Sequence, residues 1–574
     1  MIRPAASADT AKSGCRMVAE ALAAFGVRHV VTSPGSRNAP LIMAVSRRDA
    51  FRVHSVVDER SAAFVGLGMA AATGEPVALI CTSGTALLNY APAVAEAYYR
   101  HVPLIVVSAD RPEEWIDQND SQTIRQPGAL ANIVKASAVV PGELLDDDAV
   151  WMANRQLNDM LHTALCAPCG PVHVNVPLSM PLTSEAPFDD VPLFSKIELI
   201  GPDSRVSTEL ARRMAAEASG RRVLVVASQC MPDDKVNKAM ATLAALPDVA
   251  VLAEGVANIS VPGVIPVCDS LFSGIDEEDE SRFAPDLLIC FGGAPVSDGL
   301  KRFLRRAHPQ ECWRVGIDSC TIDTYRSITR RIDIEPRDFF PRFSASMKFL
   351  VGKNSRKGSF AHEWAFLRQE NIQYGLEQKL PWCGYAAVKE IISTMAPVAS
   401  KWDLQLGNGM SVRYALAADA GAFHRIDSNR GVSGIDGSVS TAVGASVLSK
   451  LPTLLIVGDM SMQYDIGALA STLISPSLAI VVMSNGGGGI FDYVATTRSL
   501  PELSKYFRGE ISLPLGRIAE AYGFEYHRAA DFSELADGMA AIARNGREKP
   551  LILEVITDSV ADASVFTKIT KRKL

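Results

Sequence analysis

Two apolar runs in the last third of the chain each end abruptly in small and polar residues. Residues 453–457 lead into Gly458-Asp459-Met460-Ser461, and residues 478–483 lead into Ser484-Asn485 and four glycines. In a parallel α/β sheet, ligands bind at the carboxyl ends of the strands. A carboxylate and a carboxamide supply the hard oxygen ligands that suit Mg²⁺, and glycines let backbone approach a phosphate closely. The pattern therefore predicts a Mg²⁺–diphosphate site on a parallel sheet.

Length and composition narrow the class of protein. A chain of 574 residues is long enough for roughly three or four domains. The net charge of −7 argues against a nucleic-acid partner, because no basic field would neutralise phosphates. Asp9, Lys12, Arg16 and Glu20 interrupt any apolar core of a secretory signal, and no apolar run is long enough to span a membrane. Ten cysteines without a framework spacing fit a reducing compartment, so we expect a cytoplasmic protein that is not an integral membrane protein.

Strand-like and helix-like segments alternate in three blocks of the chain, which is typical of βαβ units around parallel sheets. The strand candidates are His29–Thr32, Val77–Cys81, Leu104–Ser108, Val172–Val176, Arg222–Ala227, Val249–Ala253, Asp286–Phe291, Trp313–Ile317, Leu454–Val457, Ile480–Met483 and Leu551–Val555. Helices are expected at Ser61–Ala72 and Ala86–Arg100. Polar stretches at 177–194 and 352–359 are predicted to separate the blocks.

Three further segments carry side chains suited to chemistry. Glu59 ends a short apolar run and opens a small-residue helix. A buried carboxyl there suits general acid–base work, although a carboxylate stabilised by the helix macrodipole is equally consistent. Arg37 lies in a turn after a predicted strand, and Arg430 lies in a second small-residue loop. Arginine is the residue best suited to bind a carboxylate through two hydrogen bonds.

These segments together resemble one enzyme family. The Gly-Asp…Asn layout resembles the diphosphate-binding motif of thiamine diphosphate (ThDP) enzymes, although Met460 and Gly486 stand where Gly and a second Asn are usual. The strings Ser-Pro-Gly-Ser-Arg-Asn (33–38) and Ser-Asn-Arg-Gly-Val-Ser-Gly-Ile-Asp-Gly (428–437) resemble 2-succinyl-5-enolpyruvyl-6-hydroxy-3-cyclohexene-1-carboxylate synthases of menaquinone or phylloquinone biosynthesis. The resemblance extends over the whole chain and is strongest in the first and third blocks.

The resemblance implies a fold, cofactors and a reaction. The fold is the α/β three-domain ThDP-enzyme fold, with a pyrimidine-binding domain over 1–190, a central domain over 195–355 and a diphosphate-binding domain over 375–574. The cofactors are ThDP and Mg²⁺ (or Mn²⁺). The reaction is decarboxylation of 2-oxoglutarate and 1,4-addition of the succinyl-semialdehyde carbanion to isochorismate. A homodimer or homotetramer is implied, because the Glu of one subunit meets the diphosphate motif of another.

The family's functional residues map onto this sequence position by position. The implied catalytic residues are Glu59, Gln122, Arg37 and Arg413. The implied cofactor contacts are Glu59, Ser433, Gly434, Ile435, Asp459, Met460, Ser461, Asn485, Gly487, Ile490 and Phe491, with Asp459, Asn485 and Gly487 as metal ligands. The implied substrate contacts are Ser36, Arg37, Arg111, Ser121, Gln122, Lys301, Arg302, Arg413, Arg430, Phe491 and Val494. Gly409 and Ser121 depart from the family pattern, in which Ser and Asn occur at these positions.

Two alternatives compete with this interpretation. One is another ThDP-dependent 2-oxoacid decarboxylase or carboligase, such as an acetolactate-synthase-like enzyme that uses pyruvate and often binds FAD in its middle domain. The many arginines argue against a monocarboxylate substrate. The other is a non-catalytic protein of the same fold, and the intact Glu59, Asp459 and Asn485 argue against it. No convincing Ser–His–Asp or Cys–His constellation is seen, as expected if a cofactor supplies the chemistry.

Overall fold

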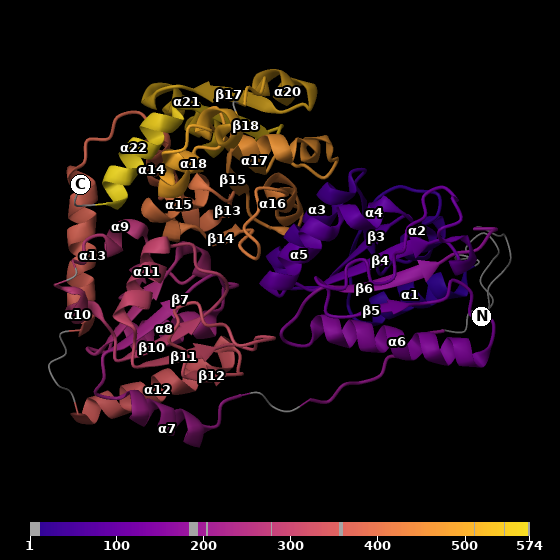
Figure 1. Ribbon diagram of the computed structural model, residues 1–574, viewed down its shortest axis with the longest axis horizontal. Coiled ribbons are helices and arrows are strands. Elements are labelled where there is room, and N and C mark those ends of the chain that lie inside the picture. Colours follow the sequence, from indigo (N-terminus) through magenta and orange to yellow (C-terminus); the bar gives the residue numbers. More distant parts are fainter. Residues whose placement is uncertain are drawn as a thin grey trace. The chain divides into compact units, whose positions relative to one another are not determined.

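The computed structural model describes residues 12–182, 193–201, 205–276, 278–354, 360–509, 511–544 and 546–571 (Figure 1). These residues form three six-stranded sheets, and the strands of each sheet run parallel. The predicted α/β class is confirmed. The predicted linkers over 177–194 and 352–359 lie partly outside the described residues. Helix α12 (Pro336–Asn354) continues into the second of them.

The first sheet has the strand order β2-β1-β3-β4-β6-β5. Its strands are β1 (His29–Thr32), β2 (Arg52–Ser55), β3 (Val77–Cys81), β4 (Leu104–Asp110), β5 (Ser137–Val139) and β6 (Val172–Pro177). The helices between them are α1 (Ser13–Ala24), α2 (Ala39–Ser46), α3 (Glu59–Thr73), α4 (Thr85–Asn89), α5 (Ala91–Arg100) and α6 (Asp147–Leu165), with the 3₁₀ turn η2 (Glu113–Trp115). The predicted helix over 86–100 is two helices, and Pro92 stands in the first turn of the second, where a proline is tolerated.

The third sheet repeats the same topology, with the order β14-β13-β15-β16-β18-β17. Its strands are β13 (Asp403–Leu406), β14 (Arg425–Ser428), β15 (Thr453–Gly458), β16 (Leu478–Ser484), β17 (Glu525–Ala529) and β18 (Leu551–Ile556). Its helices are α14 (Gly384–Met395), α15 (Met410–Ala417), α16 (Ser438–Leu448), α17 (Asp459–Tyr464), α18 (Ile490–Tyr493), α19 (Ala495–Arg498), α20 (Leu515–Ala521), α21 (Phe532–Ala543) and α22 (Ser559–Thr570). Short turns are η4 (Ala399–Lys401), η5 (Ala420–Ala422), η6 (Ile466–Ala470) and the π-helix η7 (Leu503–Arg508). The first and third blocks of the chain therefore fold with the same strand order.

The middle sheet has a different order, β12-β11-β10-β7-β8-β9, in which crossovers leave the first strand in both directions, as in doubly wound folds. Its strands are β7 (Val223–Ala227), β8 (Val249–Ala253), β9 (Ile265–Pro266), β10 (Leu287–Phe291), β11 (Glu311–Val315) and β12 (Arg330–Ile332). Its helices are α7 (Thr208–Ala218), α8 (Asp234–Ala244), α9 (Asp269–Phe272), α10 (Glu280–Phe283), α11 (Asp298–Ala307), α12 and α13 (Phe360–Glu377), with η3 (Gly255–Ala257). Helices α7, α8 and α12 pack together on one face, and α9 and α11 pack together on the other (Figure 1).

The described chain divides into two compact units. The first unit holds the first sheet together with residues 431–450 and 464–475, and the second holds the middle and third sheets. Within the first unit, α16 packs closely along α3: a Cβ on Gly444 would lie 2.0 Å from the Val65 carbonyl oxygen, and one on Gly68 would lie 2.1 Å from that of Thr441. The domain boundaries predicted from the sequence stay a prediction. Across the described ranges, every helix is too short or too polar to cross a membrane.

Candidate functional site

Asp459 joins the two loops that the sequence pattern singles out. It starts α17 directly after β15, and its side chain is buried. Its Oδ1 accepts a hydrogen bond from the Met460 N–H at 2.7 Å. Its Oδ2 accepts the N–H groups of Asn485, Gly486 and Gly487 at 3.1, 2.9 and 3.0 Å. Because β15 and β16 are neighbours in the sheet, the loops that follow them lie side by side at the carboxyl ends of the two strands. The Asp459 carboxylate binds both loops.

The glycines of the second loop are required by its shape. Gly486 and Gly487 have φ values of +83° and +135°, which residues with a side chain rarely adopt. A Cβ on Gly487 would lie 2.0 Å from the Arg508 carbonyl oxygen. The two departures from the motif are accommodated: Gly486 suits its left-handed backbone, and the Met460 side chain extends to Gly509, where an added Cβ would lie 3.3 Å from Met460 Cε.

The oxygens of these loops fit a small divalent cation. Oδ1 of Asp459 accepts one N–H, so it keeps capacity for another partner. Asn485 donates its Nδ2 to Asp562 Oδ2 at 3.2 Å, so its amide oxygen is the group left to act as ligand. The Gly487 carbonyl accepts one hydrogen bond, from Gly489 N at 2.9 Å, and a carbonyl can accept two. In the described part of the chain no cluster of three or more His, Cys, Asp and Glu side chains could hold a metal, so a metal here would take mixed oxygen ligands.

The electrostatics of Asp459 agree with that assignment. Burial raises the pKa of Asp459 to about 6, although its four backbone hydrogen bonds oppose the shift. A buried carboxylate without a cationic partner is costly, and a metal ion would supply that partner. We conclude that the loops are built around a carboxylate that can take a cation.

Three predicted substrate-binding cations, Lys301, Arg302 and Arg413, lie near enough to Asp298 at the start of α11 to lower its pKa. Lys301 Nζ lies 2.6 Å from Asp298 Oδ1, and Arg413 Nη2 lies 3.6 Å from Oδ2. Arg413 also donates Nη1 to the Gly409 carbonyl at 2.8 Å. Position 409 therefore contacts Arg413 through its backbone. Burial raises the pKa of Tyr493 on α18, while Arg413 and Arg302 lower it, which places both guanidinium groups near that helix.

Arg430 follows β14 and is buried, 8% exposed. It donates Nη1 to Asn408 Oδ1 at 3.0 Å, and Asn408 donates Nδ2 to the Asn429 carbonyl at 2.6 Å. Asn408 precedes α15, which carries Arg413. The loops after β13 and β14 are therefore fixed to each other; Arg430 lies in the second loop, and the helix that follows the first loop carries Arg413.

The predicted apolar contacts lie on α18 and beside it. The half-buried Phe491 ring packs edge-on against Phe507 at 5.6 Å. Val494 is 37% exposed. Ile490 is half-buried, and Ser461 is buried in the first turn of α17.

In the first unit, Arg37 and Arg111 lie near each other at the carboxyl ends of β1 and β4. Arg37 is 8% exposed and donates Nη1 to the Leu178 carbonyl at 2.7 Å. Its pKa is lowered by burial and by the nearby Arg111 guanidinium. Arg111 pairs with Asp120 Oδ2 at 3.0 Å and donates to the Ser121 carbonyl at 3.1 Å. Two guanidinium groups held this close attract an anion.

The remaining predicted substrate contacts of this unit lie on adjoining loops. Ser36, Ser121 and Gln122 are exposed. Gln122 has φ +55°, and a Cβ on Gly84 would lie 3.2 Å from its carbonyl oxygen. The loops after β1, β3 and β4 therefore meet at one edge of the sheet, as the strand order requires.

Glu59 is the first residue of α3, after the N-cap Asp58, which accepts the N–H groups of Arg60 and Ser61. Its side chain is half-buried, more open than the sequence interpretation expected. It acts electrostatically on the buried Cys81 thiol and Tyr90 phenol. Glu59 therefore lies at the carboxyl ends of the central strands of the first sheet.

The loop that carries Ser433, Gly434 and Ile435 is anchored in the same unit. The buried Glu96 accepts the N–H groups of Gly431 and Val432, each at 2.7 Å. Ser433 has φ +62°, and Ile435 is half-buried. The predicted site residues thus fall into two sets, one in each unit.

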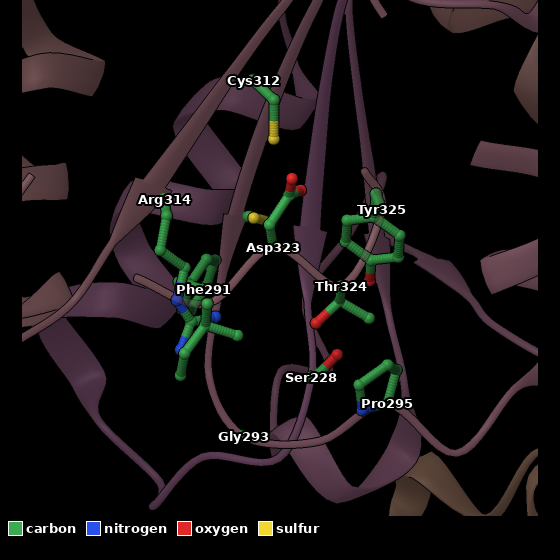
Figure 2. Close-up of a pocket in the computed structure, with 11 residues that line it drawn as sticks. Ser228, Phe291, Gly293, Pro295, Cys312, Arg314, Asp323, Thr324 and Tyr325 are labelled. Carbon is green, nitrogen blue, oxygen red and sulfur yellow. The ribbon is translucent and has the colours of Figure 1, made fainter. Parts of the chain in front are cut away.

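A small pocket lies at the carboxyl ends of the middle sheet (Figure 2). Side chains from several strand ends and from the loop 322–325 point into it, among them Ser228, Arg314, Asp323 and Tyr325. Arg314 is paired with Asp318, with Nε 2.9 Å from Oδ2. The cavity is about 10 Å³, room for about one water molecule. This pocket therefore has no space for a nucleotide.

The side chains that hold the predicted site residues in place were not predicted from the sequence. Asp298 links Lys301 to Arg413, Asn408 holds Arg430, and Asp562 holds Asn485. Of these, only the i, i+3 spacing of Asp298 and Lys301 leaves a local signal. The other contacts join residues that are distant in the sequence.

Comparison with known proteins agrees with this architecture. Residues 12–129 match the family described as thiamine pyrophosphate enzyme, N-terminal TPP binding domain. A 2-succinyl-5-enolpyruvyl-6-hydroxy-3-cyclohexene-1-carboxylate synthase of Porphyromonas gingivalis is 36% identical over 97% of this chain and 96% of its own. Proteins of the same name from Desulfotalea psychrophila (37%, 93% and 96%) and Flavobacterium johnsoniae (34%, 96% and 98%) are similarly related. The chain therefore belongs to the 2-succinyl-5-enolpyruvyl-6-hydroxy-3-cyclohexene-1-carboxylate synthase family of thiamine-dependent enzymes.

Proposed function

We propose that this enzyme joins 2-oxoglutarate, with loss of CO₂, to isochorismate, and so forms 2-succinyl-5-enolpyruvyl-6-hydroxy-3-cyclohexene-1-carboxylate in menaquinone biosynthesis. ThDP, when bound, supplies the carbanion chemistry at its thiazolium ring. The observation that carries the cofactor part is the Asp459 carboxylate, which unites two loops through four backbone hydrogen bonds. The proposed substrates are supported by relatives that are named as synthases of this product and that align with the chain over nearly their full length.

The diphosphate and its metal would be held in the second unit. Asp459, Asn485 and the Gly487 carbonyl would bind Mg²⁺ or Mn²⁺, because all three offer hard oxygen. Glycines 486–489 let the backbone approach the phosphates closely. Phe491 and Ile490 would provide apolar surface beside the cofactor, and Met460 and Ser461 would line the turn of α17.

Substrate carboxylates would be bound by the cations. Both substrates are dicarboxylates, and Arg413, Arg430, Lys301 and Arg302 in the second unit have the charge and reach to hold them. Arg37 and Arg111, with Ser36, Ser121 and Gln122, form the corresponding set in the first unit. Holding both carboxylates fixes the reacting carbons for attack and contributes through orientation.

Glu59 would hold and move a proton on the aminopyrimidine of the cofactor. Its place at the start of α3, beside the carboxyl ends of the first sheet, is consistent with that role. Ser433, Gly434 and Ile435 would contact the cofactor from the loop anchored by Glu96. A homodimer or homotetramer would bring a Glu59 of one subunit to an Asp459 of another.

Product analysis by mass spectrometry tests the proposal. The protein is incubated with ThDP, Mg²⁺ and isochorismate, with 2-oxoglutarate in one reaction and pyruvate in the other. We expect a product of isochorismate plus a succinyl-semialdehyde unit from 2-oxoglutarate only. Acetolactate from pyruvate, with no product from 2-oxoglutarate, would favour the acetolactate-synthase-like alternative and refute the proposed substrates.

A further inference from the structure

Glu254 is a buried carboxylate in the second unit that none of the roles above uses. It follows β8 directly and is fully buried. Its Oε1 accepts the backbone N–H groups of Val296 and Ser297, both at 2.7 Å. Its Oε2 has no hydrogen-bond partner among the described residues. Burying an ionisable group in this way costs folding free energy, and strongly perturbed ionisable groups concentrate at functional sites.

One side of Glu254 holds the first turn of α11. Ser297 caps this helix by accepting the Leu300 N–H at 3.0 Å, and it donates its Oγ to Asp269 Oδ1 at 2.6 Å. The same Asp269 oxygen accepts the Gly299 N–H at 2.8 Å. Two carboxylates thus fix the turn in which Asp298 lies, and Asp298 pairs with both Lys301 and Arg413.

Arg430 acts electrostatically on Glu254. Burial raises the pKa of Glu254 to about 7, while the two backbone N–H groups and the Arg430 guanidinium lower it. The guanidinium is therefore close enough to stabilise the carboxylate charge. The other ionisable groups that face Glu254 are Asp269 on α9, which raises its pKa, and the buried Tyr325 in the loop after β11.

The loop of Glu254 also holds the strand that leads to Arg430. Asn258, at the end of η3, accepts the Ile426 N–H at 2.7 Å and donates to the Ile426 carbonyl at 3.0 Å. It therefore pairs with the edge strand β14 as another strand would. Gln229, after β7, donates to Asp427 Oδ1 at 3.0 Å and to the Ser428 carbonyl at 2.7 Å. Loops of the middle sheet thus set the position of β14 and of Arg430 beyond it.

We propose that Glu254 is a positioning residue that holds Lys301 and Arg413 through the first turn of α11 and Arg430 through its negative charge, so that the three cations keep the spacing needed to bind a dicarboxylate. The proposal rests on the proposed function, which assigns these cations to the substrates. Glu254 itself does not touch the substrate. It acts as the residues behind a metal ligand do, by orienting the groups that bind.

Glu254→Gln removes the negative charge of the side chain but keeps an oxygen that can accept hydrogen bonds from the first turn of α11. The glutamine oxygen can still accept both backbone N–H groups of α11, so a purely structural cap would be largely preserved. Only the charge that acts on Arg430 is lost. A simple Coulombic effect would strengthen dianion binding when this negative charge is removed, whereas loss of positioning weakens it. The sign of the change therefore decides between the two.

The test measures binding and turnover in the full-length protein. The variants are Glu254→Gln and the control Glu335→Gln, a half-buried glutamate just before α12 whose pKa is also raised by burial. Calorimetry measures binding of glutarate, a dicarboxylate that cannot be decarboxylated, and steady-state kinetics give KM and kcat for 2-oxoglutarate. We expect Glu254→Gln to weaken glutarate binding and to raise KM at least tenfold, with kcat changed less than threefold and the control unchanged.

Equal or tighter glutarate binding by Glu254→Gln would overturn the proposal, and so would a wild-type protein that binds no glutarate. A wild-type protein that binds glutarate but turns over no 2-oxoglutarate would refute the proposed function, and the binding comparison would still decide the role of Glu254. Should the variant fail to fold, the wild type provides the test. Its glutarate affinity should fall as pH is lowered through about 7, and an affinity that stays constant between about pH 6 and 8 would overturn the proposal.

Discussion

Replacing Asp459 by asparagine should separate the folding role of this carboxylate from its role as a metal ligand. The asparagine oxygen can take over the three backbone N–H bonds made by Oδ2. Its NH₂ group would then face the Met460 N–H, whose bond to Oδ1 is lost. One orphaned donor costs about 1–3 kcal/mol, and relief from burying a charge offsets part of that. We expect unfolding free energy to change by no more than about 2 kcal/mol.

The effect on cofactor binding should be much larger. Asp459 is the only charged group in the proposed ligand set, so the variant removes all of its negative charge. We expect Mg²⁺-dependent ThDP affinity, measured by calorimetry, to fall at least 100-fold, which is about 2.7 kcal/mol. The matched control is Asp465→Asn, a buried carboxylate that accepts two hydrogen bonds from Ser440 and has its pKa raised by burial to about 6. ThDP affinity of Asp459→Asn within threefold of the wild type would refute the metal assignment.

Three further predictions concern other parts of the molecule. Gly444→Ala should destabilise the protein by about 1–3 kcal/mol, because its Cβ would lie 2.0 Å from the Val65 backbone oxygen. The control is Gly375→Ala, at a helical glycine with open space around it. Equal melting temperatures of the two variants would contradict the packing of α16 against α3. Burial lowers the pKa of His173 from 6.5 to about 4. As pH drops from about 6.5 to 4, the unfolded state therefore binds a proton at this histidine before the folded state does, and the free energy of unfolding should fall. If the melting temperature of His173→Gln changes with pH over that range as steeply as that of the wild type, this prediction is wrong. Glu59→Gln should bind ThDP normally but lose about 10²–10⁴-fold in turnover; unchanged turnover would remove Glu59 from the mechanism.

The apolar central strands could be predicted from sequence because their runs are buried on both faces, whereas the buried inner strand β13, which carries Asp403 and Gln405, was not predicted. Val77–Cys81 and Val249–Ala253 are fully buried and were predicted to the residue. Edge strands such as Arg52–Ser55 and Glu525–Ala529 were missed, since they are partly exposed and carry polar residues. A sheet edge therefore leaves a weaker pattern than a sheet centre.

The meeting of the two loops at Asp459 could be predicted for a similar reason. Parallel strands place their carboxyl ends at one edge, so two polar loops after neighbouring strands must lie together. The network behind the cations could not be predicted this way. Glu254 contacts Val296 and Ser297, and Asn258 contacts Ile426, across long stretches of sequence. Such contacts depend on how helices and strands pack, which no local pattern records.

The most direct test of the account is to follow the carboxyl carbon that leaves. The protein is supplied with 2-oxoglutarate labelled with ¹³C at C1 and with isochorismate, and labelled CO₂ and the condensed product are measured together. We expect equal amounts of both, with neither formed when ThDP or the divalent cation is left out. Labelled CO₂ without condensed product, or turnover that needs neither cofactor, would contradict it.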